Sequence, residues 1–300
     1  HIEIMSLFKL NVLHLHLTDD QGWRVEISAF SNLIKSAWRI GPTGQWEGGY
    51  YSKDDIRDIV GHARIHGVTV VPEIDVPGHV YSALAAYPEL SCTEAKFVVR
   101  PIWGIHEDIL CVGKEETFKF LETILDEIME LFPSTHIHIG GDEVPKTRWR
   151  SCPRCQRRIV QENLKDENAL QSYTIGRLAE YLARFDRKLV GWDEILEGGL
   201  HNNSTVQSWR GMEGGIMAAT LGHSCIMSPT AHCYFDYDVA ITDLKRAYEF
   251  RPTSASLSRE AKNHVSGGEF CMWTEYAPTH LIESKMWPRG LAIAEVLWSG

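Results

Sequence analysis

The chain has 300 residues, a mass of 34.1 kDa and a formal net charge of −10 at pH 7. Its 44% hydrophobic and 23% charged residues match the globular average, which excludes a disordered, collagen-like or coiled-coil chain. The acidic balance argues against nucleic acid as a partner, and no apolar run approaches the ~20 residues of a membrane span.

Short β-rich runs alternate with helical segments along most of the chain. Residues 2–10 resemble the end of a helix, and further helices are expected over residues 52–65, 115–131 and 170–185. Ser52 and Asp55 form a capping box before the first of these three helices, and Gly67 closes it. The seven candidate strands cover residues 11–17, 68–74, 136–139, 188–192, 205–209, 224–227 and 269–273. This alternation predicts an α/β fold with a parallel sheet and right-handed crossovers.

Polar clusters follow almost every candidate strand and decide between two α/β architectures. They occupy residues 18–20, 73–75, 140–143, 192–194, 209–210 and 273–275. In a (β/α)8 barrel the carboxyl ends of all strands meet on one face, where active sites form, whereas an open sheet would spread the clusters along a line. The sequence has no dinucleotide-binding or P-loop motif. We therefore predict a TIM-type barrel in one domain spanning residues 1–300.

The segment His136-Ile-His-Ile-Gly-Gly-Asp-Glu143 combines a short strand with a sharp turn and two acids. The two glycines allow the backbone to turn and a ligand to approach closely. Adjacent carboxylates repel each other, so the pKa of one of them tends to rise, which suits a general acid working near neutral pH. An isolated acidic pair is usually a solvated loop, but this pair follows a strand on a predicted barrel face. Asp142 and Glu143 are therefore the candidate catalytic residues.

Here the sequence resembles the family 20 glycoside hydrolases, the β-N-acetylhexosaminidases. The resemblance rests on His-x-Gly-Gly-Asp-Glu at residues 138–143 and covers nearly the whole chain. Further matching segments, in the order of the family, are residues 11–24, 72–79, 191–194, 206–209, 234–236 and 273–275. The resemblance implies hydrolysis of terminal, non-reducing β-linked GlcNAc or GalNAc from glycans or chitooligosaccharides, without a cofactor or metal.

The resemblance also implies a substrate-assisted, retaining mechanism, in which the acetamido carbonyl of the substrate is the nucleophile. Glu143 would protonate the glycosidic oxygen, and Asp142 would orient the acetamido N–H and stabilise the developing positive charge. Trp192, Trp209 and Trp273 resemble the walls of the acetamido pocket, and Trp273 would also stack beneath the sugar.

Five further residues receive roles from the same resemblance. Tyr234 would donate its hydroxyl to the acetamido carbonyl, and Asp236 and Glu275 would accept hydrogen bonds from sugar hydroxyls. Asp19 and His79 would form a pair that contacts Glu143 and tunes its pKa. The loops at residues 91–109 and 152–168 are expected to shape the side of the site that faces the leaving group.

The chain departs from the family at its beginning. The first barrel strand, with an Arg that grips the terminal sugar, and an upstream α+β domain would precede residue 2, and neither is in this sequence. The chain also opens on His1 instead of Met, so we expect a piece of a longer protein, poorly stable when expressed alone. At the other end, residues 288–298 resemble the last barrel helix. The resemblance favours a periplasmic or secreted location.

Two other functions remain open from the residues. His14 and His16 form an H-x-H pair, repeated at His136 and His138, which could serve a metal-dependent barrel hydrolase. Buried structural histidines are the favoured interpretation, because both pairs precede the strand ends. The second alternative is a non-catalytic sugar-binding relative, which would have no use for a tuned acid.

The seven cysteines form no regular disulfide framework. Cys152 and Cys155 make one C-x-x-C motif, and no second pair follows at zinc-finger spacing. A local disulfide or two ordinary thiols are therefore favoured over a metal site.

Overall fold

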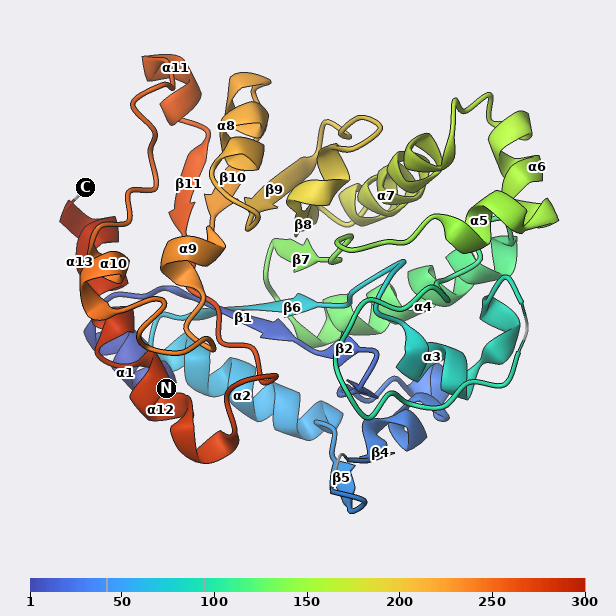
Figure 1. Cartoon of the computed structure of the whole chain (residues 1–300), viewed down its shortest axis with the longest axis horizontal. Coiled ribbons are helices and arrows are strands. Elements are labelled where there is room, and N and C mark those ends of the chain that lie inside the picture. The colour runs from blue at the N-terminus through green and yellow to red at the C-terminus, as the bar shows by residue number, and fades with distance from the viewer. Residues whose placement is uncertain (42, 94, 300) are drawn as a thin grey trace.

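The computed structural model describes residues 1–41, 43–93 and 95–299 and contains one large parallel sheet. Its seven strands pair in chain order and all run parallel to their neighbours. They are β1 Val12–His16, β6 Thr69–Glu73, β7 His136–His138, β8 Lys188–Trp192, β9 Ser204–Ser208, β10 Cys225–Met227 and β11 Val265–Gly268. The sheet curls, as Figure 1 shows, which confirms the predicted barrel architecture with these strands.

Helices cover the outer side of the curled sheet. They are α1 Ile2–Leu7, α2 Lys53–Ile65, α3 Tyr81–Ala86, α4 Glu115–Leu131, α5 Thr147–Ser151, α6 Pro153–Gln161, α7 Glu167–Ala183, α8 Glu213–Thr220, α9 Thr230–Cys233, α10 Leu244–Tyr248, α11 Arg259–Lys262, α12 Ile282–Met286 and α13 Arg289–Ser299. Helix α2 packs on β6, α7 on β8, and α8 on β9 and β10. None of the described helices combines the length and the apolar character that crossing a membrane requires.

Two small hairpins and several short 3-10 turns extend the loops. The hairpins pair β2 Thr18–Asp19 with β3 Gly22–Trp23, and β4 Trp38–Ile40 with β5 Trp46–Gly48. The 3-10 turns are Ser28–Phe30, Leu33–Ala37, Pro88–Leu90, Asp193–Leu196 and Thr279–Leu281. Helices α1 and α13, near the two ends of the chain, lie on the same side of the molecule (Figure 1), and the Lys9 ammonium lies 4.3 Å from the centre of the Trp298 ring.

The predicted helices are confirmed, with some boundaries shifted. Helix α4 has the predicted bounds, and α1 ends at Leu7, before the predicted residue 10. Helix α2 begins at Lys53, where Ser52 is the N-cap and Asp55, in the first turn, completes the capping box that the sequence indicates. Helix α7 begins three residues before the predicted start, at Glu167. The reason is an N-cap that hydrophobic periodicity does not reveal: the Asp166 carboxylate accepts the backbone N–H of Ala169 at 2.9 Å.

The last strand lies earlier in the chain than the sequence predicted. Residues 269–273 were expected to form it, but β11 covers Val265–Gly268, and the residues after it are irregular. Two glycines give this strand low β-propensity, and its register against β10 shifts between Cys225 and Ile226, with Gly267 at a φ of +136°. The aromatic residues that suggested a strand lie instead beyond its end, where they reach the site.

The main hydrophobic core lies between the sheet and the helices. On β7, Ile137 and Ile139 point into it, whereas His138 points to the inside of the curl and is also buried. This alternation is what the sequence predicted for the His-Ile-His-Ile segment. A second, smaller core joins α5, α6 and the segment around residues 109–112. The inside of the curl is therefore polar, and the apolar packing lies outside it.

Candidate active site

The carboxyl ends of all seven strands of the large sheet contribute to one cavity of about 270 Å³. That volume is slightly below the range of about 300–1,000 Å³ typical of small-molecule sites. Its lining residues are His16, Asp19, Gln21, Asp75, His79, Trp103, Gly104, Ile105, Asp142, Glu143, Trp192, Trp209, Tyr234, Asp236, Tyr237, Trp273, Glu275 and Tyr276. Every residue that the sequence proposed for catalysis, binding or support lines this cavity, because parallel strands bring their carboxyl ends to one face.

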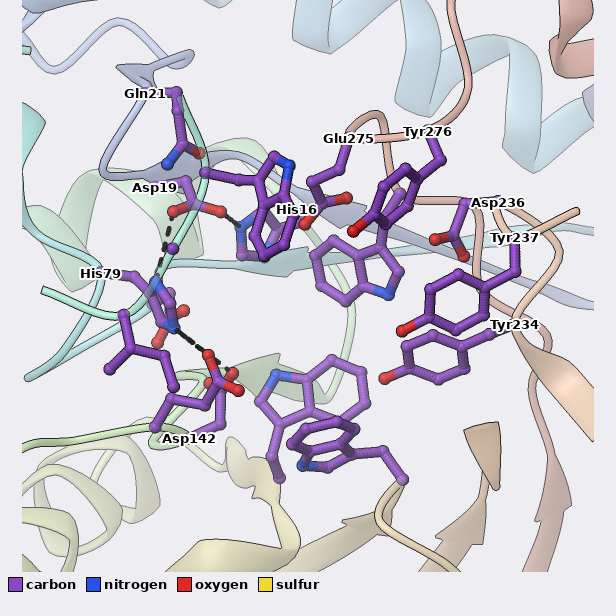
Figure 2. A pocket seen from close by; sticks show the side chains of 18 residues that line it. His16, Asp19, Gln21, His79, Asp142, Tyr234, Asp236, Tyr237, Glu275 and Tyr276 are labelled. Carbon is purple, nitrogen blue, oxygen red and sulfur yellow. Dashed lines mark hydrogen bonds and ion pairs between the residues drawn. The ribbon is translucent and has the colours of Figure 1, made fainter. Parts of the chain in front are cut away.

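Acidic and aromatic side chains face each other across the cavity. Figure 2 shows His79 and Asp142 on one side and Tyr234 and Tyr237 on the other, with both phenol hydroxyls directed into the space between. The two tyrosine rings are stacked, with centroids 6.2 Å apart. A ligand in this space would therefore contact charged groups on one side and phenol donors on the other.

The turn after β7 places Asp142 and Glu143 at the cavity. Gly140 has a φ of +69°, and a Cβ atom there would lie 1.8 Å from Asp75 Oδ1. The sequence indicated that the glycines allow a ligand to approach, but the close neighbour of Gly140 is the Asp75 carboxylate. Glu143 itself has a φ of +46°, which is strained for a residue with a side chain. Such strain persists where surrounding contacts hold it, often at functional sites.

Burial sets the protonation of Asp142. Burial raises its pKa to about 7, and the positive charge of His79 opposes that rise, while Glu73 and Glu194 add to it. The sequence predicted a raised pKa from repulsion within the pair and linked it to the general acid, but the raised pKa is on Asp142 and burial is its main cause. Burial and the nearby Asp142 carboxylate also raise the pKa of Asp75 well above its usual value. The Asp142 carboxyl in this cavity therefore changes charge near neutral pH.

His79 connects the acidic pair to the supporting carboxylates. Its Nε2 atom lies 3.4 Å from Glu143 and 3.7 Å from Asp142, and its Nδ1 atom lies 3.4 Å from Asp19 and 3.3 Å from Asp20. Burial lowers the pKa of His79, but its hydrogen bonds to Asp19, Asp20 and Glu143 outweigh that effect and raise the pKa overall. His79 is therefore a cation among four carboxylates, and Asp19 contacts it directly. Like Glu143, it has a positive φ, of 50°.

Beneath the cavity, histidines and glutamates fill the inside of the curl. His14 lies 2.9 Å from Glu269 and 3.0 Å from Glu73, and His16 lies 2.7 Å from Glu73 and 2.9 Å from Asp19. Both ring nitrogens of each histidine are thus close to carboxylates, which raise the pKa of both rings against the opposing effect of burial. These contacts account for both rings as structural groups paired with carboxylates, so a metal-dependent hydrolase built on this pair is not favoured.

The other H-x-H pair divides between two environments. His138 Nδ1 lies 3.1 Å from Glu73, and burial lowers the pKa of this imidazole despite that neighbour. His136 is half-buried at the start of β7, where its Nδ1 lies 3.1 Å from the Thr135 hydroxyl. The two rings therefore do not form a common site.

Aromatic rings make the apolar wall. The buried Trp192 donates its indole N–H to Glu73 at 2.9 Å, and Trp209 donates to Glu194 at 2.9 Å, so both indoles are fixed from behind. Trp273 lies 6.0 Å from Trp192 and 6.4 Å from Tyr234, measured between ring centroids. The three tryptophans thus meet around one space, as the sequence predicted. The hydrogen bonds of Trp192 and Trp209 to carboxylates orient these two rings in a way that apolar packing alone would not, whereas the buried Trp273 indole N–H has no hydrogen-bond partner among the described residues.

Some buried polar atoms of the cavity-lining residues have no hydrogen-bond partner within the described part of the chain. Among the described residues, the buried Asp142 Oδ1 and Asp236 Oδ1 accept no hydrogen bond. Burial raises the pKa of Asp236 to about 6 and that of Glu275 above its usual value. Burial also raises the pKa of Tyr234 well above its usual value, so the phenol stays a hydrogen-bond donor. Unsatisfied buried acceptors are costly, and a ligand with N–H and O–H groups would satisfy them.

Several lining residues were missed by sequence reasoning. Asp75 belongs to a polar cluster at a strand end that the sequence flagged but gave no role. Tyr237 and Tyr276 each follow a predicted site residue, so adjacency was the available signal. Trp103 and Ile105 come from the loop at residues 91–109, which was expected near the leaving-group side of the site.

The second loop expected there behaves differently. Residues 152–168 contain helix α6, and among the described residues none of this segment lines the cavity. Pro153 occupies the first helical turn, where proline is favoured, and Cys155 and Ile159 face the second core. The expectation of a loop at the site was therefore wrong. A second hollow, beside Glu143 and Ile105, is lined instead by Lys146, Glu194 and Arg210, among others.

Comparisons with known proteins agree with this geometry. Residues 1–300 match the model of the family described as glycosyl hydrolase family 20, catalytic domain. A β-hexosaminidase of Porphyromonas gingivalis is 42% identical over 100% of this chain. The crystal structure of a β-N-acetylhexosaminidase from Bacteroides fragilis matches 99% of the chain with a TM-score of 0.86 and 32% identity.

A mutant Streptomyces plicatus β-hexosaminidase, solved in complex with the product GlcNAc, covers 100% of the chain with a TM-score of 0.83 and 29% identity. The chain spans 40% of the P. gingivalis protein, 62% of the B. fragilis chain and 60% of the S. plicatus chain.

Proposed function

The chain belongs to glycosyl hydrolase family 20, and we propose that it hydrolyses terminal, non-reducing β-linked N-acetylhexosamine from glycans by a substrate-assisted, retaining mechanism. The observation that carries this proposal is the opposition of two features in one cavity. Asp142 lies on one side and the phenol rings of Tyr234 and Tyr237 lie on the other (Figure 2), and Glu143 and several indole rings line the same cavity. An acetamido group between them would meet an acceptor for its N–H, a donor for its carbonyl and apolar walls for its methyl group.

The first step breaks the glycosidic bond. Glu143 gives its proton to the glycosidic oxygen, while the acetamido carbonyl oxygen attacks C1 and forms an oxazolinium ring. Asp142 accepts the acetamido N–H at its unpartnered Oδ1 and, once ionised, stabilises the positive charge of the ring. Tyr234 donates to the carbonyl oxygen and orients it for attack. The pKa of about 7 on Asp142 places its ionisation near neutral pH.

The second step opens the ring. Glu143, now a carboxylate, removes a proton from water, and the resulting hydroxide bonds to C1 while the acetamido oxygen leaves. The sugar keeps its anomeric configuration because C1 is attacked twice from opposite faces. Trp192, Trp209 and Trp273 exclude other water from the reactive ring until this step. Asp236 and Glu275 accept hydrogen bonds from sugar hydroxyls and hold the ring in place.

The experiment compares Glu143→Gln with Glu275→Gln on aryl and alkyl β-GlcNAc glycosides. Removing a general acid costs most when the leaving group needs a proton, so we expect Glu143→Gln to lose about 10²–10⁴-fold in kcat on the alkyl glycoside and far less on a dinitrophenyl glycoside. Glu275→Gln makes the same chemical change in the same cavity, and its loss should be similar for both substrates.

The amide variant of the second acid tests the proposed role of Asp142. We expect Asp142→Asn to lose about 10²–10⁴-fold in turnover even on the dinitrophenyl substrate, because charge stabilisation is needed for any leaving group. Equal losses for Glu143→Gln on all leaving groups would contradict the proposed acid. Binding of GlcNAc without turnover in the unmodified protein would favour the sugar-binding alternative instead.

A further inference from the structure

Four cysteines meet on the side of the second core that faces residues 91–112. The sulfur atoms of Cys92, Cys111, Cys152 and Cys155 all lie within 4.8 Å of one another. The sequence showed only one close pair, Cys152 and Cys155, and for that reason favoured a disulfide or ordinary thiols. The fold supplies the other two ligands, Cys92 and Cys111, from a loop earlier in the chain. Cys111, the nearer of the two, precedes Cys152 by 41 residues. Four thiols at one point make a complete set for a tetrahedral metal.

The measured sulfur–sulfur distances fit a single ion. Cys111 lies 3.6 Å from Cys152 and 3.7 Å from Cys155, and Cys155 lies 3.8 Å from Cys92. With zinc–sulfur bonds of about 2.3 Å, the edge of a regular tetrahedron is about 3.8 Å long. An iron–sulfur cluster would need sulfur atoms much farther apart, because several metal atoms would have to fit among them. The space at this point therefore suits one ion.

Disulfides explain the arrangement less well. Two separate bridges would place two sulfur pairs at about 2.05 Å and leave the pairs independent of each other. Here Cys111 is as close to Cys155 as to Cys152, so the sulfurs have no preferred pairing. Equal spacing among neighbours is what four corners around one centre would produce.

The surroundings close the site and support its ligands. Cys111, Cys152 and Cys155 are buried beside Trp149. A Cβ atom on Gly113 would lie 2.3 Å from the backbone of Arg154, so glycine is needed for the loop to reach α6. A site with four protein ligands and no open position is structural in type.

We propose that these four thiolates bind one zinc ion that fastens the loop at residues 92–111 to helix α6. The four thiols release their protons to solvent as the ion binds. The loop carries Trp103 and Ile105 to the cavity, and α6 follows the turn that holds Asp142 and Glu143. The ion thereby ties a loop that lines the candidate active site to a helix that follows the acidic turn in the chain. The inference rests on the cysteine geometry alone and does not depend on the proposed hydrolase activity.

The test measures metal content and thiol state in the purified protein. Elemental analysis should find about one zinc per chain, and chelation under denaturing conditions should release it and expose all seven cysteines as free thiols. Cys155→Ala and Cys92→Ala should each lower the zinc content severalfold. Cys225→Ala is the matched control, because it removes an equally buried thiol in β10, and it should keep its zinc.

A second readout needs no variant, and thus remains valid if the cysteine substitutions prevent folding. Stripping zinc from the unmodified protein with a strong chelator should increase hydrogen exchange in residues 92–111 and α6, and adding zinc back should reverse the change. Protein without metal whose seven cysteines are all free thiols would overturn the proposal. So would a mass lowered by the hydrogens of two disulfides, or iron in place of zinc.

Discussion

At the scale of single residues, His79 links the acidic groups of the site through direct contacts. It is the group that contacts both members of the acidic pair and also both supporting aspartates, Asp19 and Asp20. Its backbone has a positive φ, like that of Glu143. Such local strain often occurs where functional side chains are held in position. Sequence reasoning proposed the His79 contact with Glu143. It did not show that His79 would be a cation, since that follows from carboxylates contributed by two segments far apart in sequence.

The charge on His79 should set the pH dependence of the reaction. Burial raises the pKa of Asp142 to about 7, and the positive charge of His79 prevents a larger rise. In the free enzyme kcat/KM should therefore decline as the pH falls through about 7, where Asp142 becomes protonated. Removing the cation in His79→Gln should raise the pKa of Asp142 and move this acid limb to higher pH, as measured in a pH series of kcat/KM.

The control for that shift is His136→Gln, at the opposite end of β7, where the acid limb should stay in place. A lower rate alone would not distinguish an electrostatic role from lost packing, but a displaced pKa would. An acid limb at the same pH in both variants would show that His79 does not tune Asp142.

At the scale of elements, the turn after β7 depends on the close approach of the Gly140 backbone to the Asp75 carboxylate. Gly140 and Gly67 have nearly the same φ, +69° and +70°, but only Gly140 has a neighbour, Asp75, within contact distance of an added Cβ. Replacing each by alanine separates two costs. Gly67→Ala should lower the free energy of unfolding by ~1–2 kcal/mol, the cost of the left-handed backbone.

Gly140→Ala should cost more, about 2–5 kcal/mol, because it adds a steric clash to the same backbone strain. It should also reduce kcat, since Asp142 and Glu143 follow directly, whereas Gly67→Ala should keep full kcat. Urea unfolding and steady-state kinetics on both variants measure the two effects. Equal destabilisation by the two substitutions would show that Asp75 can move aside.

Elements were predictable from sequence where local chemistry and periodicity agreed. Strand β8 and helix α4 have the predicted bounds because both show strong, uninterrupted hydrophobic patterns. Strand β11 does not have the predicted bounds. Its segment Val265-Ser-Gly-Gly268 has little intrinsic preference for a strand and is held by its pairing with β10. Helix α6 was taken for a loop because it is short and has few apolar residues among Arg and Gln.

At the scale of the whole molecule, the sheet has two open edges. In the described residues β1 and β11 each pair on one side only, and apolar side chains near β1 are exposed, including Leu7 at 77% and Val12 at 44%. Polar contacts partly bridge the gap, since His14 of β1 bonds to Glu269 just after β11. Unpaired edges and exposed apolar groups reduce stability and promote aggregation.

We therefore expect residues 1–300 expressed alone to melt at low temperature with weak cooperativity and to show weak turnover. A form that supplies a further strand between β1 and β11 should be more stable, because it would pair both edges and cover these side chains. Thermal unfolding by circular dichroism, with light scattering to detect aggregation, compares the two. Cooperative melting of residues 1–300 at ordinary temperatures with full turnover would contradict the expectation.

The sequence by itself determined the alternation of strands and helices, the barrel architecture and the residues at the strand ends. The strands and helices follow from local periodicity and from motifs a few residues long. The residues at the strand ends meet because parallel strands bring their carboxyl ends to one face. Only the tertiary structure decided which groups become charged and which distant segments meet. Burial and neighbouring charges assigned the raised pKa to Asp142 and the cationic form to His79. The approach of Cys92 and Cys111 to the C-x-x-C pair likewise depends on chain packing that no local pattern encodes.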